Sequence, residues 1–251
     1  MLIGHQPKEF LLAVEALTVS FDGFKAVNDL SFYVDENEIR VIIGPNGAGK
    51  TTVLDLICGK TKATSGSIQF RGQELTKLKE NRIVQAGVGR KFQTPSIYDD
   101  LTVLENLEIS YPRGRTVFGA LMFKRDAEVR DRIEEVAEMI FLKDKLNMYA
   151  EFLSHGQKQW LEIGMLLAQE PQLLLVDEPV AGMTDSETEQ TAELLREINK
   201  TRSVVVVEHD MAFVRALGVK VTVLHEGSVL SEGSIDHVSA DPRVIEVYLG
   251  R

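Results

Sequence analysis

One segment of the chain carries the residue types and spacing of a phosphate-binding loop. It reads Gly44-Pro45-Asn46-Gly47-Ala48-Gly49-Lys50-Thr51 and is followed by Thr52. Glycine lets successive backbone N–H groups turn inward around an anion without a side-chain clash. Lys50 adds a positive charge for the β- and γ-phosphates, and the Thr51 hydroxyl is a ligand for Mg²⁺. A Gly-rich turn with an incidental Lys-Thr pair is the alternative, and the pattern favours the phosphate site.

Two carboxylates complement this loop. The apolar run Leu173–Val176 ends in Asp177 and Glu178. Ligands of open α/β sheets bind at the carboxyl ends of the strands, where such a run delivers its last side chains. Asp177 is predicted to hold Mg²⁺ through its water shell, and Glu178 to polarise an attacking water. Alone, an apolar strand ending in Asp-Glu is ordinary; beside a phosphate-binding loop it indicates hydrolysis of a nucleotide.

The elements that must position these residues can be read from hydrophobic periodicity. A β-branched strand at Arg40–Ile43 leads into the glycine loop, and helical spacing follows at Lys50–Cys58. Near-continuous apolar runs predict buried parallel strands, and alternating runs predict half-buried ones. The predicted strands are Leu11–Phe21, Ala26–Val34, Gly66–Gly72, Leu173–Val176, Val204–Val207 and a hairpin of Val221–Leu224 with Ser228–Ser231. Amphipathic helices are predicted from Asp126 to Ile140 and at Gly156–Ala168, which gives an α/β core with a helical insertion.

Composition disfavours several classes of protein. The 251 residues carry a net charge of −10, so no bulk basic face is available for nucleic acid. With Cys58 as its single cysteine the chain has no intrachain disulfide, and a reducing compartment is expected. No apolar run approaches the roughly 20 residues of a membrane span, and the first residues lack the pattern of a signal peptide. We therefore expect a cytoplasmic protein whose role at a membrane is peripheral.

A further set of residues narrows the interpretation. Leu153-Ser154-His155-Gly156-Gln157 resembles the Leu-Ser-Gly-Gly-Gln signature of ATP-binding cassette (ABC) proteins, and other marks of that family occur in the right order over about residues 11–250. Gln93 is similar to its Q-loop glutamine, which also contacts Mg²⁺, and His209 to its switch histidine. Phe21 lies where the family places an aromatic side chain that stacks on adenine. Gln93 and His209 are alternatively a surface and a structural residue, and Phe21 is alternatively a core residue.

The signature departs from the family pattern at one position. His155 replaces a glycine and would bring a bulky, titratable ring beside a γ-phosphate. Ser154 is also the expected N-cap of the helix that follows it. Thr184 stands about where many cassettes carry an aspartate, which puts that contact in doubt.

The resemblance implies a fold and a domain organisation. The expected fold is α/β: a P-loop NTPase (RecA-like) core sheet, an N-terminal antiparallel β subdomain and an inserted α-helical subdomain. Within one ABC ATPase domain spanning 1–251, the β-rich and catalytic core is expected at about 1–91 and 170–251. The helical subdomain is expected at about 92–169.

The resemblance also implies an activity and a branch of the family. ATP and Mg²⁺ are the expected cofactors of an ATPase in which Lys50, Gln93, Glu178 and His209 act catalytically. The remaining nucleotide contacts come from Phe21, Gly44–Thr52 and Ser154–Gln157. The segments Phe92–Pro95, Val180–Met183 and Asp241–Gly250 resemble the cassettes of branched-chain amino acid importers, and within that branch Ser154–Trp160 and Val206–Met211 resemble urea importer ATPases. The expected cargo is a small polar solute, urea or a related amide or amino acid.

One loop and one signature per chain imply that a second cassette, identical or a paralogue, completes the site head to tail. Separate transmembrane permease subunits would receive, at the cytoplasmic face of the inner membrane, the movement of the two cassettes as they close and separate. The chain would contact the membrane only through these permease subunits, which are expected to dock beside Gln93. No nucleic acid is expected as a partner. An exporter or lipid-transport ATPase is the alternative. A soluble chromosome- or ribosome-associated ABC protein is disfavoured, because such proteins carry tandem cassettes or long coiled coils.

Overall fold

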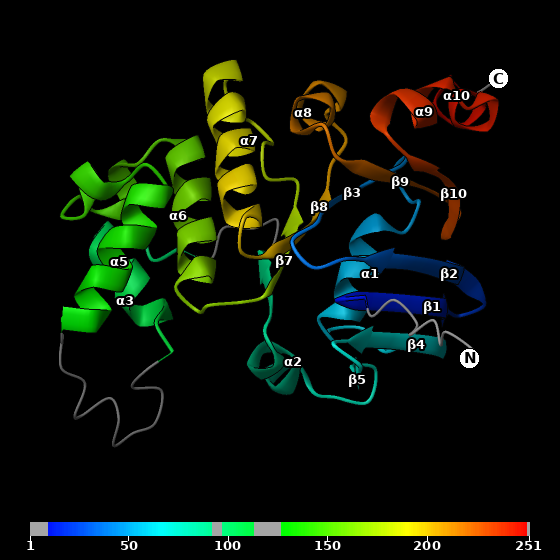
Figure 1. Ribbon diagram of the computed structural model, residues 1–251, viewed down its shortest axis with the longest axis horizontal. Helices are drawn as coiled ribbons and strands as arrows, with labels where there is room; N and C mark the ends of the chain where they lie inside the picture. The colour runs from blue at the N-terminus through cyan, green and yellow to red at the C-terminus, as the bar shows by residue number, and fades with distance from the viewer. Residues whose placement is uncertain (1–9, 92–96, 113–126, 250–251) are drawn as a thin grey trace, which may run out of the picture. The chain divides into compact units, whose positions relative to one another are not determined.

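The computed structural model describes residues 10–91, 97–112 and 127–249, and it divides the chain into two compact units. Unit 1 comprises residues 1–86 and 218–251, and unit 2 comprises residues 87–217. Figure 1 shows the helices and strands of both and labels most of them. The expected subdomain limits at about residues 92 and 169 remain predictions.

Unit 1 contains an antiparallel sheet in the order β2-β1-β4-β5 and a second group of strands in which β3 pairs in parallel with β9, and β9 pairs with β10 as a hairpin. Its strands are β1 Leu12–Phe21, β2 Phe24–Val34, β3 Ile39–Ile43, β4 Ser65–Phe70, β5 Gln73–Glu74, β9 Lys220–His225 and β10 Ser228–Gly233. Its helices are α1 Lys50–Ile57, α2 Glu80–Ala86, α9 Ile235–Ala240 and α10 Pro242–Leu249. Every residue of β3 is buried, as its β-branched composition predicts.

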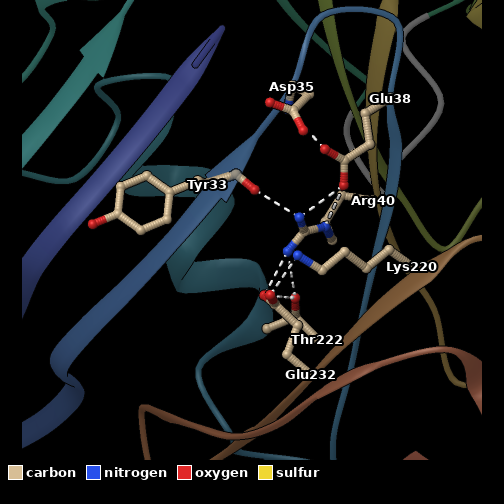
Figure 2. Close-up of polar contacts among 7 residues, drawn as sticks. All are labelled: Tyr33, Asp35, Glu38, Arg40, Lys220, Thr222 and Glu232. Atoms are coloured by element: carbon tan, nitrogen blue, oxygen red, sulfur yellow. Dashed lines mark hydrogen bonds and ion pairs between the residues drawn. The ribbon is translucent and has the colours of Figure 1, made fainter. Parts of the chain in front are cut away.

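A buried arginine joins four strands or strand ends of unit 1 (Figure 2). The Arg40 side chain on β3 is 1% exposed and donates to Glu232 Oε2 on β10 at 2.6 Å and to Thr222 Oγ1 on β9 at 3.0 Å. It also donates to Glu38 Oε1 at 2.7 Å and to the Tyr33 carbonyl of β2 at 2.7 Å. Because a buried guanidinium is costly unless its donors are satisfied, this cluster fixes β3 among its neighbours.

Unit 2 contains a parallel sheet in which β7 lies between β6 and β8. Its strands are β6 Val88–Lys91, β7 Leu173–Asp177 and β8 Ser203–Val207. Its helices are α3 Val103–Ser110, α5 Ala127–Met139, α6 His155–Leu167, α7 Asp185–Asn199 and α8 Met211–Leu217, with short 3₁₀ turns at Lys143–Lys145 and Ala150–Phe152. Helices α3, α5 and α6 contact one another, and α7 contacts α8 (Figure 1).

The elements predicted from periodicity are confirmed to within a few residues. The strand before the glycine loop is β3, the helix after it is α1, and the two continuous apolar runs are the fully buried strands β7 and β8. The amphipathic run from Asp126 is helix α5, which begins at Ala127. The expected α/β fold class, with one antiparallel sheet, parallel strands and helices, is what the chain adopts.

Candidate nucleotide-binding and catalytic site

The glycine loop of unit 1 is shaped by two glycines that no other residue could replace. A Cβ on Gly44 (φ +154°) would lie 2.3 Å from the Leu224 carbonyl oxygen, and one on Gly49 (φ +97°) would lie 2.4 Å from the Ala26 carbonyl oxygen. The loop therefore packs directly on the backbone of β9 and β2. The sequence pattern required glycine here because the chain passes too close to other strands for any side chain.

Lys50 closes the loop from inside. Its side chain is buried, and its ammonium donates to the carbonyl oxygens of Gly44 at 2.8 Å and Pro45 at 3.1 Å. Helix α1 begins at Lys50 with Gly49 as its N-cap and no side-chain cap, which leaves its first N–H groups for an anion. Thr51, in the first turn, is exposed. A helix N-terminus and a cation thus lie together where the sequence predicts phosphate binding.

Phe21, at the end of β1, is 49% exposed. Its backbone pairs with Phe24, which is 67% exposed, across the turn Asp22-Gly23. The alternative that Phe21 is a core residue is therefore not what the chain adopts. Both rings are available as flat apolar surfaces on unit 1.

In unit 2, β7 ends in the buried carboxylate of Asp177. It lies 3.5 Å from the guanidinium of Arg90 on the adjacent strand β6, and both side chains are almost fully buried. A neighbouring cation favours the ionised form of a carboxyl group. Arg90 was not predicted from the sequence as part of the site, because its approach to Asp177 depends on the pairing of β6 with β7.

Glu178 and His209 lie side by side at the ends of neighbouring strands. Glu178 has φ +47°, and its N–H donates to the Val207 carbonyl of β8 at 2.9 Å. His209 Nδ1 lies 3.4 Å from Glu178 Oε1. The Glu178 side chain is 30% exposed and the His209 side chain 63% exposed, so water reaches both. A left-handed glutamate is uncommon, and here its carboxylate lies beside the histidine.

Glu208 organises the loops that carry these two residues. It is buried, and its carboxylate accepts backbone N–H bonds from Val180 at 3.3 Å, His209 at 2.9 Å and Asp210 at 3.2 Å. Burial raises the pKa of the Glu208 carboxyl, and the three N–H donors partly offset that effect. Sequence reasoning missed this residue. The signal available was a carboxylate placed directly after a continuous apolar strand.

The signature residues begin helix α6. Ser154 is its N-cap, as predicted: Ser154 Oγ accepts from the Gln157 N–H at 3.2 Å, and the Ser154 N–H donates to Gln157 Oε1 at 3.1 Å. His155 turns toward the segment after Glu178, with Nε2 3.0 Å from the Ala181 carbonyl oxygen. Further along α6, Trp160 Nε1 donates to Thr191 Oγ1 of α7 at 2.9 Å. The Trp160–Thr191 bond therefore connects the signature helix to α7.

A second buried ion pair connects α6 to the strand that leads toward Gln93. Lys91 Nζ on β6 lies 3.3 Å from Glu162 Oε2, and both side chains are buried. Gln93 itself falls outside the described residues, so its predicted role is not tested.

The predicted site residues therefore form two groups. Phe21 and Gly44–Thr52 belong to unit 1, whereas Ser154–Gln157, Asp177, Glu178 and His209 belong to unit 2. Within unit 2 the structure brings Glu178 to His209. Their assigned roles toward nucleotide and Mg²⁺ remain predictions.

Comparisons with known proteins agree with this geometry. The family model described as "ABC transporter" matches residues 27–181. The chain is 36% identical to the high-affinity branched-chain amino acid transport ATP-binding protein LivG of Salmonella typhimurium, over 96% of this chain and 98% of that protein. It is 34% identical to BraF of Pseudomonas aeruginosa, which carries the same description, with the same coverage.

Solved structures of similar fold include nucleotide-binding proteins. A nucleotide-free ATP-binding cassette from an ABC transporter superimposes with a TM-score of 0.85 at 29% identity, covering 96% of this chain and all of that one. The ADP conformation of MJ1267, an ATP-binding cassette of an ABC transporter, gives 0.84 at 30% identity, covering 96% of this chain and 99% of that one.

Proposed function

The chain belongs to the ABC transporter family of ATP-hydrolysing cassettes, and from that membership we propose that it is the ATP-binding and ATP-hydrolysing subunit of an importer. The observation that carries the proposal is similarity along nearly the whole chain to LivG and BraF, whose descriptions name high-affinity amino acid transport. The exporter alternative has no comparable support.

Unit 1 supplies the binding chemistry in this proposal. The backbone N–H groups of Gly44–Thr52 and the N-terminus of α1 hold the phosphates, and Lys50 exchanges its carbonyl partners for the β- and γ-phosphates. Phe21 stacks on the adenine. The Thr51 hydroxyl is proposed as a ligand of Mg²⁺, which takes few protein ligands and completes its shell with water and phosphate oxygens. Asp177, from unit 2, is proposed to hold the ion through its water shell. When bound, Mg²⁺ neutralises charge on the phosphates.

Unit 2 supplies the hydrolytic chemistry. Glu178 orients and polarises the attacking water, and His209, 3.4 Å from it, contacts the γ-phosphate region. Gln93 is proposed to report the presence of nucleotide and Mg²⁺. The buried Glu208 carboxylate keeps the Glu178 and His209 loops in register through its three N–H bonds.

Two such chains, or this chain and a paralogue, are proposed to associate head to tail. Each signature, Ser154–Gln157, then completes the nucleotide site of the other cassette. ATP can drive this closure only if it binds the closed state better than the open one, which contact of its γ-phosphate with both cassettes provides. Hydrolysis removes that contact and releases the pair.

Separate permease subunits are proposed to carry the solute, with this chain attached at the cytoplasmic face of the inner membrane. Within the described ranges, no helix has the length and apolar character needed to cross a membrane. Tyr98, Tyr149 and Phe152 are about half or more exposed. They lie on two segments held together by the Thr102–Tyr149 bridge and by the Glu151 N–H bond to the Asp99 carbonyl. Tyr98 follows Gln93 closely in the chain, and the three exposed aromatic side chains suit contact with a permease.

Two cargoes follow from different observations. The named relatives favour branched-chain amino acids, whereas the Ser154–Trp160 and Val206–Met211 segments favour urea or a related amide. Uptake of labelled leucine and labelled urea by cells that lack the gene, with and without the restored gene, separates them. Loss of neither uptake would contradict both cargo proposals.

Glu178→Gln tests the ATPase mechanism. The substitution is nearly isosteric, so ATP should still bind, while turnover should fall roughly 10²–10⁴-fold because the water loses its carboxylate. Gel filtration of the variant, with its partner cassette present, should show an ATP-dependent increase in size. Lys50→Ala in the same background is the control and should abolish that increase. Full turnover in Glu178→Gln would refute the role of Glu178, and lost turnover without association would refute the head-to-tail pair.

A further inference from the structure

A carboxylate of the same chain occupies the start of the signature helix. Ser154 Oγ donates to Glu187 Oε1 at 3.0 Å. The Glu187 side chain also lies against the next turn, since a Cβ added to Gly156 would fall 2.5 Å from its Cδ and Oε1 atoms. Glu187 comes from helix α7, 33 residues further along the chain. It therefore lies at the end of α6 that carries the positive partial charge and the free N–H groups.

Glu187 is held there by its own helix. Its Oε2 atom accepts from the Thr184 N–H at 3.0 Å and from Thr184 Oγ1 at 3.0 Å, as the N3 residue of the capping box of α7. The Thr184 N–H holds the pKa of Glu187 below its ordinary value against the effect of burial, and Thr184 Oγ1, Ser154 and His155 add to this. The side chain is thus a fixed negative charge at neutral pH. One of its oxygens is bonded to Thr184, the N-cap of α7, and the other to Ser154, the N-cap of α6.

The contact with Glu187 uses the only proton that the Ser154 hydroxyl can donate. A serine hydroxyl has one proton to donate, and its oxygen here also accepts from the Gln157 N–H at 3.2 Å. A phosphate that is to accept a hydrogen bond from Ser154 must displace Glu187 as the acceptor, and it must approach a helix end where a carboxylate already lies. Like charges at such a distance repel, and hydrogen bonds to ionised acceptors are about twice as strong as neutral ones.

We propose that Glu187 competes, within its own chain, with the γ-phosphate of the facing cassette for the Ser154 hydroxyl, and so sets the ATP concentration at which two cassettes associate. Glu187 is a positioning residue: it orients Ser154 in the open state and releases it on closure. The proposal rests on the head-to-tail function proposed above.

The neighbouring contacts give the release a structural route. His155 Nε2 lies 3.0 Å from the Ala181 carbonyl, and the His155 ring lies near the space a Gly182 Cβ would fill, at 3.4 Å. Two parts of the chain therefore contact the first turn of α6: the segment after Glu178, through Ala181, and the carboxylate of Glu187. A ligand that draws Ser154 away from Glu187 acts on the segment that leads back to the proposed catalytic residue.

Glu187→Gln, introduced into Glu178→Gln so that ATP is not consumed, provides the test. The amide has a single acceptor oxygen: with that oxygen on Thr184, its NH₂ group faces Ser154 Oγ, so the side chain no longer accepts the Ser154 proton and carries no charge. The half-saturating ATP concentration for association, read by light scattering with the partner cassette, should fall roughly three- to tenfold. In the otherwise wild-type chain KM for ATP should fall while kcat stays within about twofold. Glu193→Gln removes the same charge from an exposed position of α7 and is the matched control, with no expected shift.

Three outcomes would overturn the inference. The first is an unchanged or higher half-saturating ATP concentration in Glu187→Gln when urea unfolding shows the variant folded. The second is an equal shift in Glu193→Gln. The third is a full-sized shift in the Ser154→Ala background, where no hydroxyl remains to be competed for. Failure of the Glu178→Gln parent to associate at all would overturn the proposed function first, which makes the two failures distinguishable.

Discussion

At the scale of single residues, the sequence predicted one of the two exposed aromatic side chains at the β1–β2 turn, Phe21, and not the other, Phe24. Phe21 was predicted to stack on adenine from its place in the family pattern, with a core role as the alternative. Its 49% exposure leaves the ring face available. Phe24 was not predicted as a surface partner. Its pairing with Phe21 depends on the turn Asp22-Gly23, where both residues have positive φ and allow a tight hairpin.

Phe21→Ala should therefore weaken ATP binding by about 1–2 kcal/mol, or roughly 5- to 30-fold, the scale of one lost aromatic stack. Single-turnover hydrolysis at saturating ATP should be largely intact, because Glu178 and His209 are unchanged. Phe24→Ala removes an equally large exposed ring one turn away and is the matched control. Titration with a fluorescent ATP analogue measures both. If Phe24→Ala weakened ATP binding and Phe21→Ala left it unchanged, the stacking role would belong to Phe24.

At the scale of elements, local patterns predicted what local contacts stabilise. The N-cap at Ser154 was predictable because its capping partner Gln157 lies three residues away. The fully buried strands β7 and β8 were predictable because continuous apolar runs have few other uses in an α/β fold. Glu187 and Arg90 were not predictable as parts of the site, since each reaches its partner across tertiary structure. Arg40 pairs with Glu232, 192 residues away, and no pattern in the sequence announces that bond.

The Arg40 cluster gives the fold a measurable acid sensitivity (Figure 2). Burial raises the pKa of Glu232, but Lys220 at 2.6 Å, Arg40 and Thr222 outweigh that effect and bring it below its ordinary value of 4.5. The stabilisation that Glu232 provides is therefore fully present above that ordinary value. It is lost as the pH falls through the lower pKa of the folded state.

Glu232→Gln should cost about 1–3 kcal/mol of unfolding free energy at pH 7, the scale of a hydrogen bond to a charged group. The difference from the wild type should shrink steadily as the pH falls below 4.5, because Glu232 is protonated first in the unfolded and then in the folded wild type, until neither chain carries the charge. Urea unfolding across this range measures it, with Glu246→Gln on the exposed face of α10 as the control. A cost that is independent of pH would mean that packing rather than charge explains the effect of Glu232.

At the scale of the whole molecule, the sequence predicted both groups of site residues, and the family resemblance implied that the signature of one cassette completes the nucleotide site of another. The glycine loop belongs to unit 1 and the signature to unit 2. Gln93, which the family pattern associates with both nucleotide and permease, lies outside the described residues. Which nucleotide the signature contacts depends on the association of two cassettes. A measurement at several protein concentrations is therefore needed to test it.

Hydrogen exchange of Glu178→Gln supplies that measurement. In dilute protein, ATP should slow exchange of the backbone amides in residues 46–52, because those N–H groups bind phosphates of a nucleotide held by the same chain. The amides of His155 and Gly156 begin helix α6 and lack a partner from a preceding turn. If the signature serves the facing cassette, ATP should protect these amides only at protein concentrations where association occurs, with the partner cassette present. Lys50→Ala should remove protection from both segments. Protection of His155 and Gly156 that follows ATP alone, with no dependence on protein concentration, would show that the signature acts on its own chain's nucleotide and would contradict the head-to-tail arrangement.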